Sequence, residues 1–265
     1  MIFYLSCTGN TRYVAAHLAQ ALGESLVNVA EVWQQGLQEW RLSKDEVVGF
    51  CFPVHGWRPP LLIRRWMREL RLIPAEQSGH YSFAVCTAGD TTGETFDIFR
   101  ADLREKGWNL DAMFSLRLPN TYVGLPFMDV DERERAQSKW NETTAVLPKI
   151  VCDIKERKSG TFDPLRGRWP RINSRLLGKW FVESLVTDEP FRADADLCSH
   201  CGHCAKVCPV QNIVMSEEGL PQWQHRDDCL TCFACYHGCP QKAVAFGSRT
   251  KGKGQYRANE FQKDL

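Results

Sequence analysis

Several features that define large classes of protein are missing from this chain of 265 residues. No apolar run approaches the 18 residues that a transmembrane helix needs, so the sequence predicts no membrane span. The N-terminus lacks the charged-then-apolar pattern of a signal peptide, so a cytoplasmic location without disulfides is expected. The formal net charge is only +1, which gives no global case for nucleic-acid binding.

The charge is unevenly distributed within an otherwise ordinary composition, which is 43% hydrophobic and 25% charged. Residues 155–180 hold eight lysines and arginines against Glu156 and Asp163, and residues 248–265 hold five against two acidic residues. We interpret these stretches as a solvated connection and a solvated, mobile tail. The alternative is a docking surface for an acidic redox partner or for an anionic membrane.

Cysteine, in contrast, is abundant, and eight of the 12 cysteines follow one spacing that occurs twice near the C-terminus. Each copy reads C-x2-C-x2-C-x3-C and is followed by proline, and the second copy lies 31 residues after the first. The copies are Cys198, Cys201, Cys204 and Cys208, and Cys229, Cys232, Cys235 and Cys239. This is the spacing by which bacterial two-cluster ferredoxins hold two [4Fe-4S] clusters, so the sequence predicts electron transfer.

The spacing also predicts which cysteines share a cluster. Three cysteines on a tight loop surround one cluster, and the cysteine before the proline ligates the other. One predicted set is therefore Cys198, Cys201, Cys204 and Cys239, and the other is Cys229, Cys232, Cys235 and Cys208. Ile213 and Val244 extend the repeat at the same offset, which indicates two related half-domains.

Structural zinc is the main alternative for these cysteines, because it also uses C-x2-C pairs. Zinc needs four ligands per ion, and it would leave the third cysteine and the Cys-Pro ending unexplained. His200, His203, His225 and His237 lie among the cysteines. A Rieske centre replaces cysteine with histidine, but no cysteine is missing here, so we expect these histidines at the surface or beside the ligands.

The first 157 residues alternate between apolar runs of strand length and segments with helical periodicity. The expected strands are 2–5, 26–29, 47–52, 81–86 and 112–118, and the expected helices cover residues after Thr11, after Pro60, around 96–103 and within 131–157. Such alternation is typical of an α/β fold with a parallel sheet, in which Cys51 and Cys86 are small core residues. A further helix is expected near 172–186.

Loops at the carboxyl ends of parallel strands are where such sheets bind ligands, and three of them qualify: 6–11, 53–58 and 87–93. The first is rich in groups that donate to phosphate oxygens, and the following helix adds its N-terminal N–H groups. It consists of Ser6, Cys7, Thr8, Gly9, Asn10 and Thr11. The G-x-x-x-x-G-K-[ST] and G-x-G-x-x-G patterns are both absent. An ordinary helix cap is the alternative.

Strand-Ser-x-Thr-Gly-Asn-Thr resembles the FMN phosphate loop of flavodoxins, and the cysteine block closely resembles bacterial two-cluster ferredoxins. The chain thus resembles the fused flavodoxin–ferredoxin proteins of anaerobic bacteria and archaea. The resemblance implies a flavodoxin-like domain over 1–157, a connecting segment at 158–190, a small α+β two-[4Fe-4S] domain over 191–247 and a tail at 248–265.

The same resemblance implies where FMN would lie. Loop 6–11 would hold the phosphate, while two further loops would flank the flavin ring: Pro53, Val54, His55, Gly56, Trp57 and Arg58, and then Thr87, Ala88, Gly89 and Asp90. Trp57 is the candidate to stack on the ring, with ordinary packing as its alternative. No aromatic residue occurs in 87–93, so one flavin face is expected to be open unless Tyr122 covers it.

The resulting hypothesis is electron transfer between two [4Fe-4S] clusters and FMN, from a low-potential one-electron donor to a two-electron acceptor. Its partner would be a ferredoxin or another redox protein. The alternative is a ferredoxin-linked FMN oxidoreductase whose open flavin face reduces a small organic molecule or quinone. A third interpretation is an N-terminal domain that has lost its flavin. The sequence does not identify the electron donor or acceptor. It also does not give the direction of electron flow, the reduction potentials or the oligomeric state.

Overall fold

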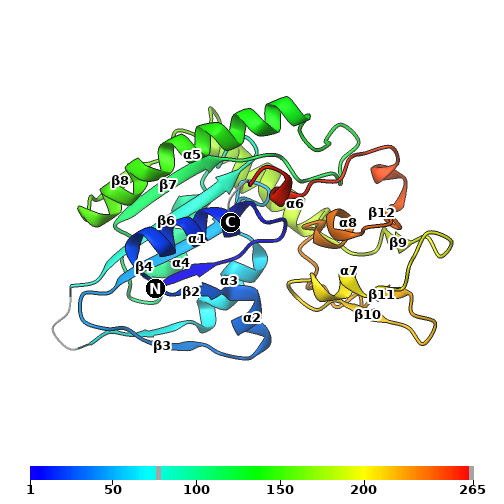
Figure 1. The fold of residues 1–265 in the computed structure, drawn as a ribbon. Coiled ribbons are helices and arrows are strands. Elements are labelled where there is room, and N and C mark those ends of the chain that lie inside the picture. Colours follow the sequence, from blue (N-terminus) through cyan, green and yellow to red (C-terminus); the bar gives the residue numbers. More distant parts are fainter. Residues whose placement is uncertain (76–78, 263–265) are drawn as a thin grey trace.

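A parallel sheet of six strands organises the first two thirds of the chain in the computed structural model, which describes residues 1–75 and 79–262 (Figure 1). The strand order is β2-β1-β4-β6-β7-β8, and every neighbouring pair is parallel. The strands are β1 (Ile2–Tyr4), β2 (Leu26–Asn28), β4 (Val47–Pro53), β6 (Tyr81–Ala88), β7 (Ala112–Arg117) and β8 (Gly160–Phe162). The predicted α/β class with a parallel sheet is confirmed.

Helices cover both faces of this sheet, because its strands send successive side chains to opposite sides. Phe50 and Phe52 of β4 pack into one apolar cluster, and Cys51 between them packs into the other. The first cluster lies under α2 (Val29–Gln34), α3 (Leu61–Glu69) and α4 (Thr95–Arg104). The second lies under α1 (Asn10–Leu22) and α5 (Arg133–Lys155). Cys51 and Cys86 are fully buried, as predicted.

Two short elements add a parallel pair beside the main sheet, β3 (Glu39–Arg41) with β5 (Arg71–Ile73). The sequence analysis did not anticipate this pair, because three residues carry too little periodicity to stand out. Within the described ranges, no helix combines the length and the apolarity that crossing a bilayer requires.

The cysteine-rich region folds as two similar halves. The halves contain α7 (His203–Lys206) with β10 (Ile213–Met215), and α8 (Ala234–Gly238) with β12 (Val244–Phe246), so that helix and strand recur at an offset of 31. The antiparallel partners of the two strands are β11 (Pro221–Trp223) and β9 (Phe191–Ala193).

The repeat extends to the backbone conformation of these halves. Positive φ angles recur at the offset in three pairs: His200 with Thr231, Gly202 with Phe233, and Gln211 with Lys242. A non-glycine residue with positive φ is uncommon, so three matched pairs show that both halves need the same loop shape. This supports the half-domain repeat predicted from Ile213 and Val244.

The segment 158–190, expected as a connection, contributes directly to the first part of the molecule. Its β8 pairs with β7 at the edge of the sheet. A π-helical turn (Ile172–Leu177) then leads into α6 (Gly178–Ser184), where a helix was expected. Leu165 and Ser174 are buried among the loops at the end of the sheet.

The expectation of a mobile tail is wrong for residues 248–262, because an aromatic side chain anchors them. Tyr256 is 5% exposed, accepts a hydrogen bond from Trp140 Nε1 (3.0 Å) and donates one to Asn10 Oδ1 (2.6 Å). Its backbone N–H donates to His237 Nδ1 at 3.1 Å. The tail therefore joins the first helix, the long helix α5 and the cysteine-rich region at one residue.

We expect Tyr256→Phe to destabilise the protein by about 1–3 kcal/mol, because it leaves Trp140 Nε1 and Asn10 Oδ1 buried without this hydroxyl. The measurement is the free energy of unfolding by denaturant, or the thermal midpoint. Tyr13→Phe is the control, since Tyr13 packs edge-on against the same Trp140 ring at 4.9 Å between centroids. Equal effects of the two variants would contradict the anchoring role of Tyr256.

Candidate functional site

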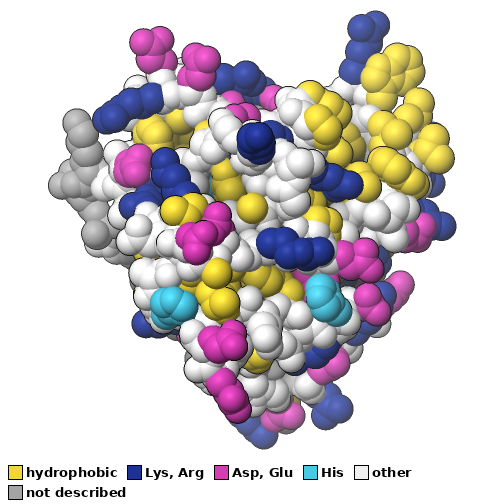
Figure 2. All heavy atoms as spheres, turned by 90° about the vertical axis from the view of Figure 1, so that its right-hand side faces the viewer, with side chains coloured by type: hydrophobic (Ala, Val, Ile, Leu, Met, Phe, Trp, Pro, Cys, Tyr) yellow, Lys and Arg dark blue, Asp and Glu magenta, His cyan; other side chains and the backbone are white. Residues whose placement is uncertain are grey.

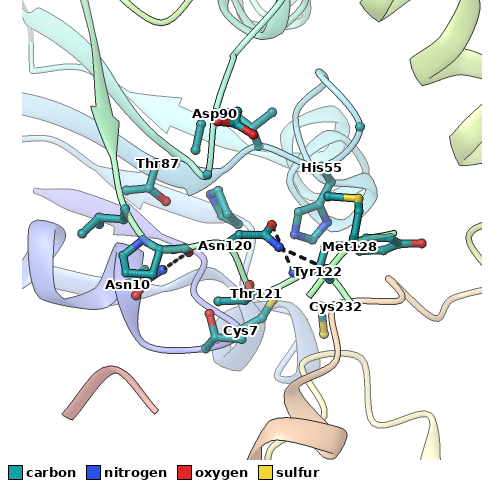
Figure 3. Close-up of a pocket in the computed structure, with 18 of the residues that line it drawn as sticks. Cys7, Asn10, His55, Thr87, Asp90, Asn120, Thr121, Tyr122, Met128 and Cys232 are labelled. Carbon is teal, nitrogen blue, oxygen red and sulfur yellow. Dashed lines mark hydrogen bonds between the residues drawn. The ribbon is translucent and has the colours of Figure 1, made fainter. Parts of the chain in front are cut away.

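A cavity of about 470 Å³ lies where β1, β4 and β6 end, which is within the usual size of a small-molecule site (Figure 3). All three loops that the sequence singled out border it. From those loops the lining residues are Cys7, Thr8, Asn10, Thr11, Pro53, Val54, His55, Gly56, Trp57, Thr87, Ala88, Gly89, Asp90 and Thr91. Ser6 is absent from this lining, and Gly9 borders a neighbouring cleft instead.

The first loop presents the N-terminus of a 13-residue helix to this cavity. Gly9 is the N-cap residue of α1, and no side chain caps the helix there. Gly9 has φ of 98°, and a Cβ at this position would come 2.7 Å from the Cβ of Ala258. The backbone N–H of Gly9 donates to Ser6 Oγ (3.2 Å). An uncapped helix start, glycine and hydroxyl groups fit an anionic phosphate group.

The Asn10 side chain, expected to donate to phosphate, makes hydrogen bonds within the protein instead. Its Nδ2 donates to the Pro119 carbonyl at 3.1 Å (Figure 3). Its Oδ1 accepts from the Tyr256 hydroxyl. Thr11 pairs its Oγ1 with that of Thr87 at 2.8 Å. These two side chains connect the loop to its neighbours and so fix its shape.

The second and third loops are joined by hydrogen bonds across the cavity wall. Val54 N–H donates to the Thr87 carbonyl (2.9 Å), and Trp57 Nε1 donates to Thr91 Oγ1 (2.8 Å). The Trp57 ring is thereby tied to the third loop. The surrounding protein lowers the pKa of His55 to about 4, because burial disfavours the charged imidazolium. His55 is thus neutral at physiological pH.

Three further contributions line the cavity, and of their residues only Tyr122 was expected there from the sequence. They are the segment after β7, from Leu118 to Met128, the side chain of Phe181 and the run Leu230–Cys232. Tyr122, named above as a possible cover for the flavin, lines the cavity and contacts Phe181 and Phe233 edge-on. Burial raises the pKa of its hydroxyl to about 12. No local sequence signal distinguishes these residues, since only the tertiary fold brings them here.

The cavity meets the cysteine-rich region through a pair of thiols. Cys7 of the first loop and Cys232 of the second motif both line the cavity (Figure 3), and the neighbouring Cys7 side chain raises the pKa of Cys232. Leu230, two residues earlier, is 4% exposed and belongs to the core cluster of the parallel sheet. The second cysteine motif is therefore packed against the end of the sheet.

The structure places the eight motif cysteines around two small cavities, in the crossed arrangement described above. One cavity is lined by Cys208, Cys229, Cys232 and Cys235. The other is lined by Cys198, Cys201, Cys204 and Cys239. Each group of four combines three cysteines from one motif with the last cysteine of the other, which is what two four-iron clusters require.

Backbone N–H groups are directed at the sulfur atoms of these cysteines. Asn212 N–H donates to Cys208 Sγ at 3.3 Å, and Ala243 N–H donates to Cys239 Sγ at 3.2 Å. These two bonds are equivalent under the 31-residue repeat. Donors aimed at sulfur stabilise negative charge on a thiolate.

Thiols of the second group have raised pKa values. Burial raises the pKa of Cys229 to about 12, and it also raises that of Cys235. Without a metal these thiols stay protonated at neutral pH, and iron binding replaces the protons. Cys201 in the first group is exposed, and the backbone N–H of His203 lowers its pKa. The protein thus shifts the pKa values of thiols in the two groups in opposite directions.

The histidines among the cysteines are not part of either group of four. His200, His203 and His225 are exposed, as expected. His237 is buried, since it is only 3% exposed, and its Nε2 lies 2.7 Å from the Thr121 carbonyl. It connects α8 to the cavity segment that follows β7, and it lies between Cys235 and Cys239 in the chain, beside the expected ligands rather than at the surface.

Comparison with known families bears on this region. The model of the 4Fe-4S dicluster domain family matches residues 191–240, which include all eight motif cysteines. These residues form a 4Fe-4S dicluster domain. Iron–sulfur electron transfer of the ferredoxin type is therefore the chemistry of the C-terminal part of the chain.

Curated relatives are similar to about a quarter of the chain. The arsenate respiratory reductase iron-sulfur subunit ArrB of Shewanella sp. (strain ANA-3) is 36% identical over 71 residues, covering 26% of this chain and 30% of that protein. A ferredoxin of Pyrobaculum islandicum is 34% identical over 71 residues, covering 24% and 64%. The chain thus spans less than two thirds of the length of these relatives.

Two solved structures resemble the chain more loosely. The Trp repressor binding protein from Bacillus subtilis has a TM-score of 0.30 and 11% identity, covering 44% of this chain and 83% of that one. Rubredoxin oxygen:oxidoreductase from Desulfovibrio gigas has a TM-score of 0.29 and 12% identity, covering 58% and 36%. Similarity at this level carries no argument about the first domain.

The crossed cysteine sets of the dicluster domain can be tested by counting iron. The variant Cys201→Ala/Cys239→Ala should keep about four irons per chain, because both losses fall on one cluster. The matched variant Cys232→Ala/Cys239→Ala should lose nearly all iron, because each cluster loses one ligand. Iron assay after anaerobic purification measures both. The reverse pattern would show that each motif ligates its own cluster.

Proposed function

We propose that the chain transfers electrons between two [4Fe-4S] clusters in its dicluster domain and an FMN held in the cavity at the end of the parallel sheet. It would connect a low-potential one-electron donor, such as a ferredoxin, with a two-electron acceptor. One observation carries the proposal: the loop of the second cysteine motif, Leu230–Cys232, lines the same cavity as the three sheet loops. The two redox sites would be immediate neighbours.

The order of the sheet supports a flavodoxin-like first domain. Counted along the chain, the strands β1, β2, β4, β6 and β7 lie in the order 2-1-3-4-5, which is the flavodoxin-like order. Such sheets bind ligands where the chain direction across the sheet reverses, beside the first strand and the third. Here that position lies between β1 and β4, and the cavity is lined by the loops that follow them.

The cavity residues divide into a polar end and an apolar end that suit FMN. The N–H groups at the N-terminus of α1 and the hydroxyl of Thr8 would hold the phosphate. Val54, Ala88 and Tyr122 would enclose the flavin ring and exclude water from it. Bound FMN would supply a group that stores one or two electrons, which single clusters cannot do.

The contact between Cys7 and Cys232 would connect the two sites. A cluster-bound thiolate carries no proton, so in the loaded protein Cys7 would donate the hydrogen bond and Cys232 would accept it. Such a bond favours the more negative, reduced cluster and raises its potential. Cys7 would therefore tune the cluster nearest the cavity without acting as a ligand.

Rapid mixing with a reduced one-electron donor tests the internal transfer. With the donor in constant excess, we expect the flavin absorbance to decay in a first-order phase. The rate of this phase should not depend on protein concentration, because both sites lie in one chain. Cluster absorbance should fall before the flavin absorbance does. A flavin phase whose rate rises in proportion to protein concentration would show transfer between molecules and would contradict the proposal.

The phosphate loop is tested by two glycines at opposite ends of α1. Gly9→Val should abolish FMN binding, because a side chain at φ of 98° distorts the loop and would collide with Ala258. Gly23→Val places the same strain at φ of 70°, where a Cβ meets nothing within 4 Å, and should keep FMN. Flavin released by acid and iron per chain are measured together. Stoichiometric FMN in Gly9→Val would refute the loop assignment, whereas unchanged iron would show that the dicluster domain is intact.

A further inference from the structure

An exposed apolar stripe runs along the outer side of the helical segment that precedes the dicluster domain. Its members recur every three or four residues, from Trp169 just before the π-helical turn to Trp180 in α6, and each has about half of its surface or more in solvent. They are Trp169 (60% exposed), Ile172 (48%), Leu176 (67%) and Trp180 (56%), with Leu177 (44%) beside them. Figure 2 shows hydrophobic side chains gathered in a projecting corner of the molecule, with lysine and arginine side chains beside it.

A cationic stripe accompanies the apolar one, displaced by a single residue. Its members are Arg168, Arg171, Arg175 and Lys179, and all four are exposed. Because the offset is one residue, the two stripes run side by side along the helix. The guanidinium of Arg168 lies 5.9 Å from the centre of the Trp169 ring, which places a positive charge on the apolar stripe itself.

Two carboxylates face these cations, and they do not cancel the charge. Glu94 has a side chain that is 5% exposed, and it pairs with Arg175 Nε at 2.6 Å and lies 3.9 Å from Arg171. Glu183 lies 3.9 Å from Lys179. Four cations against two carboxylates leave this flank with a net positive charge. The side chain of Glu94, one of the two carboxylates, is buried.

The opposite side of the same helical segment is fixed to the cavity loops. Ser174 donates to the Trp57 carbonyl at 2.8 Å, and its Oγ accepts the Glu94 N–H at 2.7 Å. Gly178 packs so closely that a Cβ would lie 2.2 Å from the Gly56 carbonyl oxygen. Phe181 reaches the cavity. The apolar stripe is therefore the outer face of an anchored helix, and packing within the chain leaves it exposed.

We propose that this helix docks the protein onto an anionic membrane surface. An apolar stripe with a cationic flank is the pattern of helices that lie in the interface between water and lipid. Tryptophan favours that interface, and here Trp169 and Trp180 stand at the two ends of the stripe. The net positive flank complements acidic head groups. A projecting stripe can enter a lipid surface without a matching groove in a partner.

Docking in this way would set the orientation of the cavity. The helix has its outer face in the lipid surface and its inner residues Gly178 and Phe181 against the cavity loops. The cavity would consequently lie one helix thickness, roughly 10 Å, from the lipid surface. This inference does not depend on what the cavity binds, because it rests on the helix alone.

Co-sedimentation of the full-length, cluster-loaded protein with vesicles tests the proposal. One set of vesicles is phosphatidylcholine, and the other contains an equal share of phosphatidylglycerol. We expect binding to the mixed vesicles at low salt, and weaker binding at high salt and to phosphatidylcholine alone. Absence of sedimentation with the mixed vesicles at low salt would overturn the proposal.

Two variants separate the apolar and the cationic contributions. Leu176→Asp should abolish vesicle binding. Arg168→Gln/Lys179→Gln should weaken binding to mixed vesicles about 25-fold, since each cation near an acidic surface contributes about fivefold. The matched controls, with unchanged binding expected, are Val146→Asp on the exposed side of α5 and Lys44→Gln/Lys251→Gln. Iron content and circular dichroism should match the wild type in all four.

The same variants distinguish a lipid surface from a protein partner. Unchanged vesicle binding by Leu176→Asp would overturn the proposal. If Leu176→Asp slowed electron exchange with a soluble donor protein while the wild type ignored vesicles, the helix would serve a protein partner, and the membrane proposal would be overturned as well.

Discussion

The packing of Leu230–Cys232 against the carboxyl end of the parallel sheet is the contact on which the rest of the molecule depends. Leu230 is buried in the core of the sheet, and Cys232 meets the first loop at Cys7. The residue between them, Thr231, donates through its hydroxyl to the Thr187 carbonyl at 3.0 Å and accepts the N–H of the same residue. One loop thus belongs simultaneously to a cluster site, to the cavity wall and to the hydrophobic core.

Other contacts hold the dicluster domain against the first part of the chain. His237 is joined to the segment after β7, and the tail fixes the position of His237 through the Tyr256 N–H. Gln34 Nε2 of α2 donates to the Pro209 carbonyl at 3.0 Å on the other side of the dicluster domain. Polar contacts with defined partners give one geometry, and leaving a buried member such as His237 unpaired would cost desolvation energy. The two sites are accordingly fixed relative to each other.

The features predicted correctly from the sequence were those that depend on the spacing of residues close together in the chain. The cysteine pattern, the buried strand runs around Cys51 and Cys86, and the three loops after β1, β4 and β6 each depend on a few adjacent residues. The tail, β8 and the part of the cavity formed by Tyr122 and Phe181 depend on contacts between residues far apart in the chain. Tyr256 shows the difference: in sequence it is one tyrosine in a basic stretch, and only the fold supplies Trp140 and Asn10.

The sharing of the 230–232 loop has a consequence for the evolution and engineering of such chains. A fused protein is often pictured as two exchangeable modules on a linker, in which either one can be replaced by a homologue. Here a transplanted dicluster domain would have to reproduce Leu230 in the sheet core, Thr231 on the connecting segment and Cys232 beside Cys7. Sequence drift in one half is therefore constrained by the other, and the junction will coevolve as a single surface.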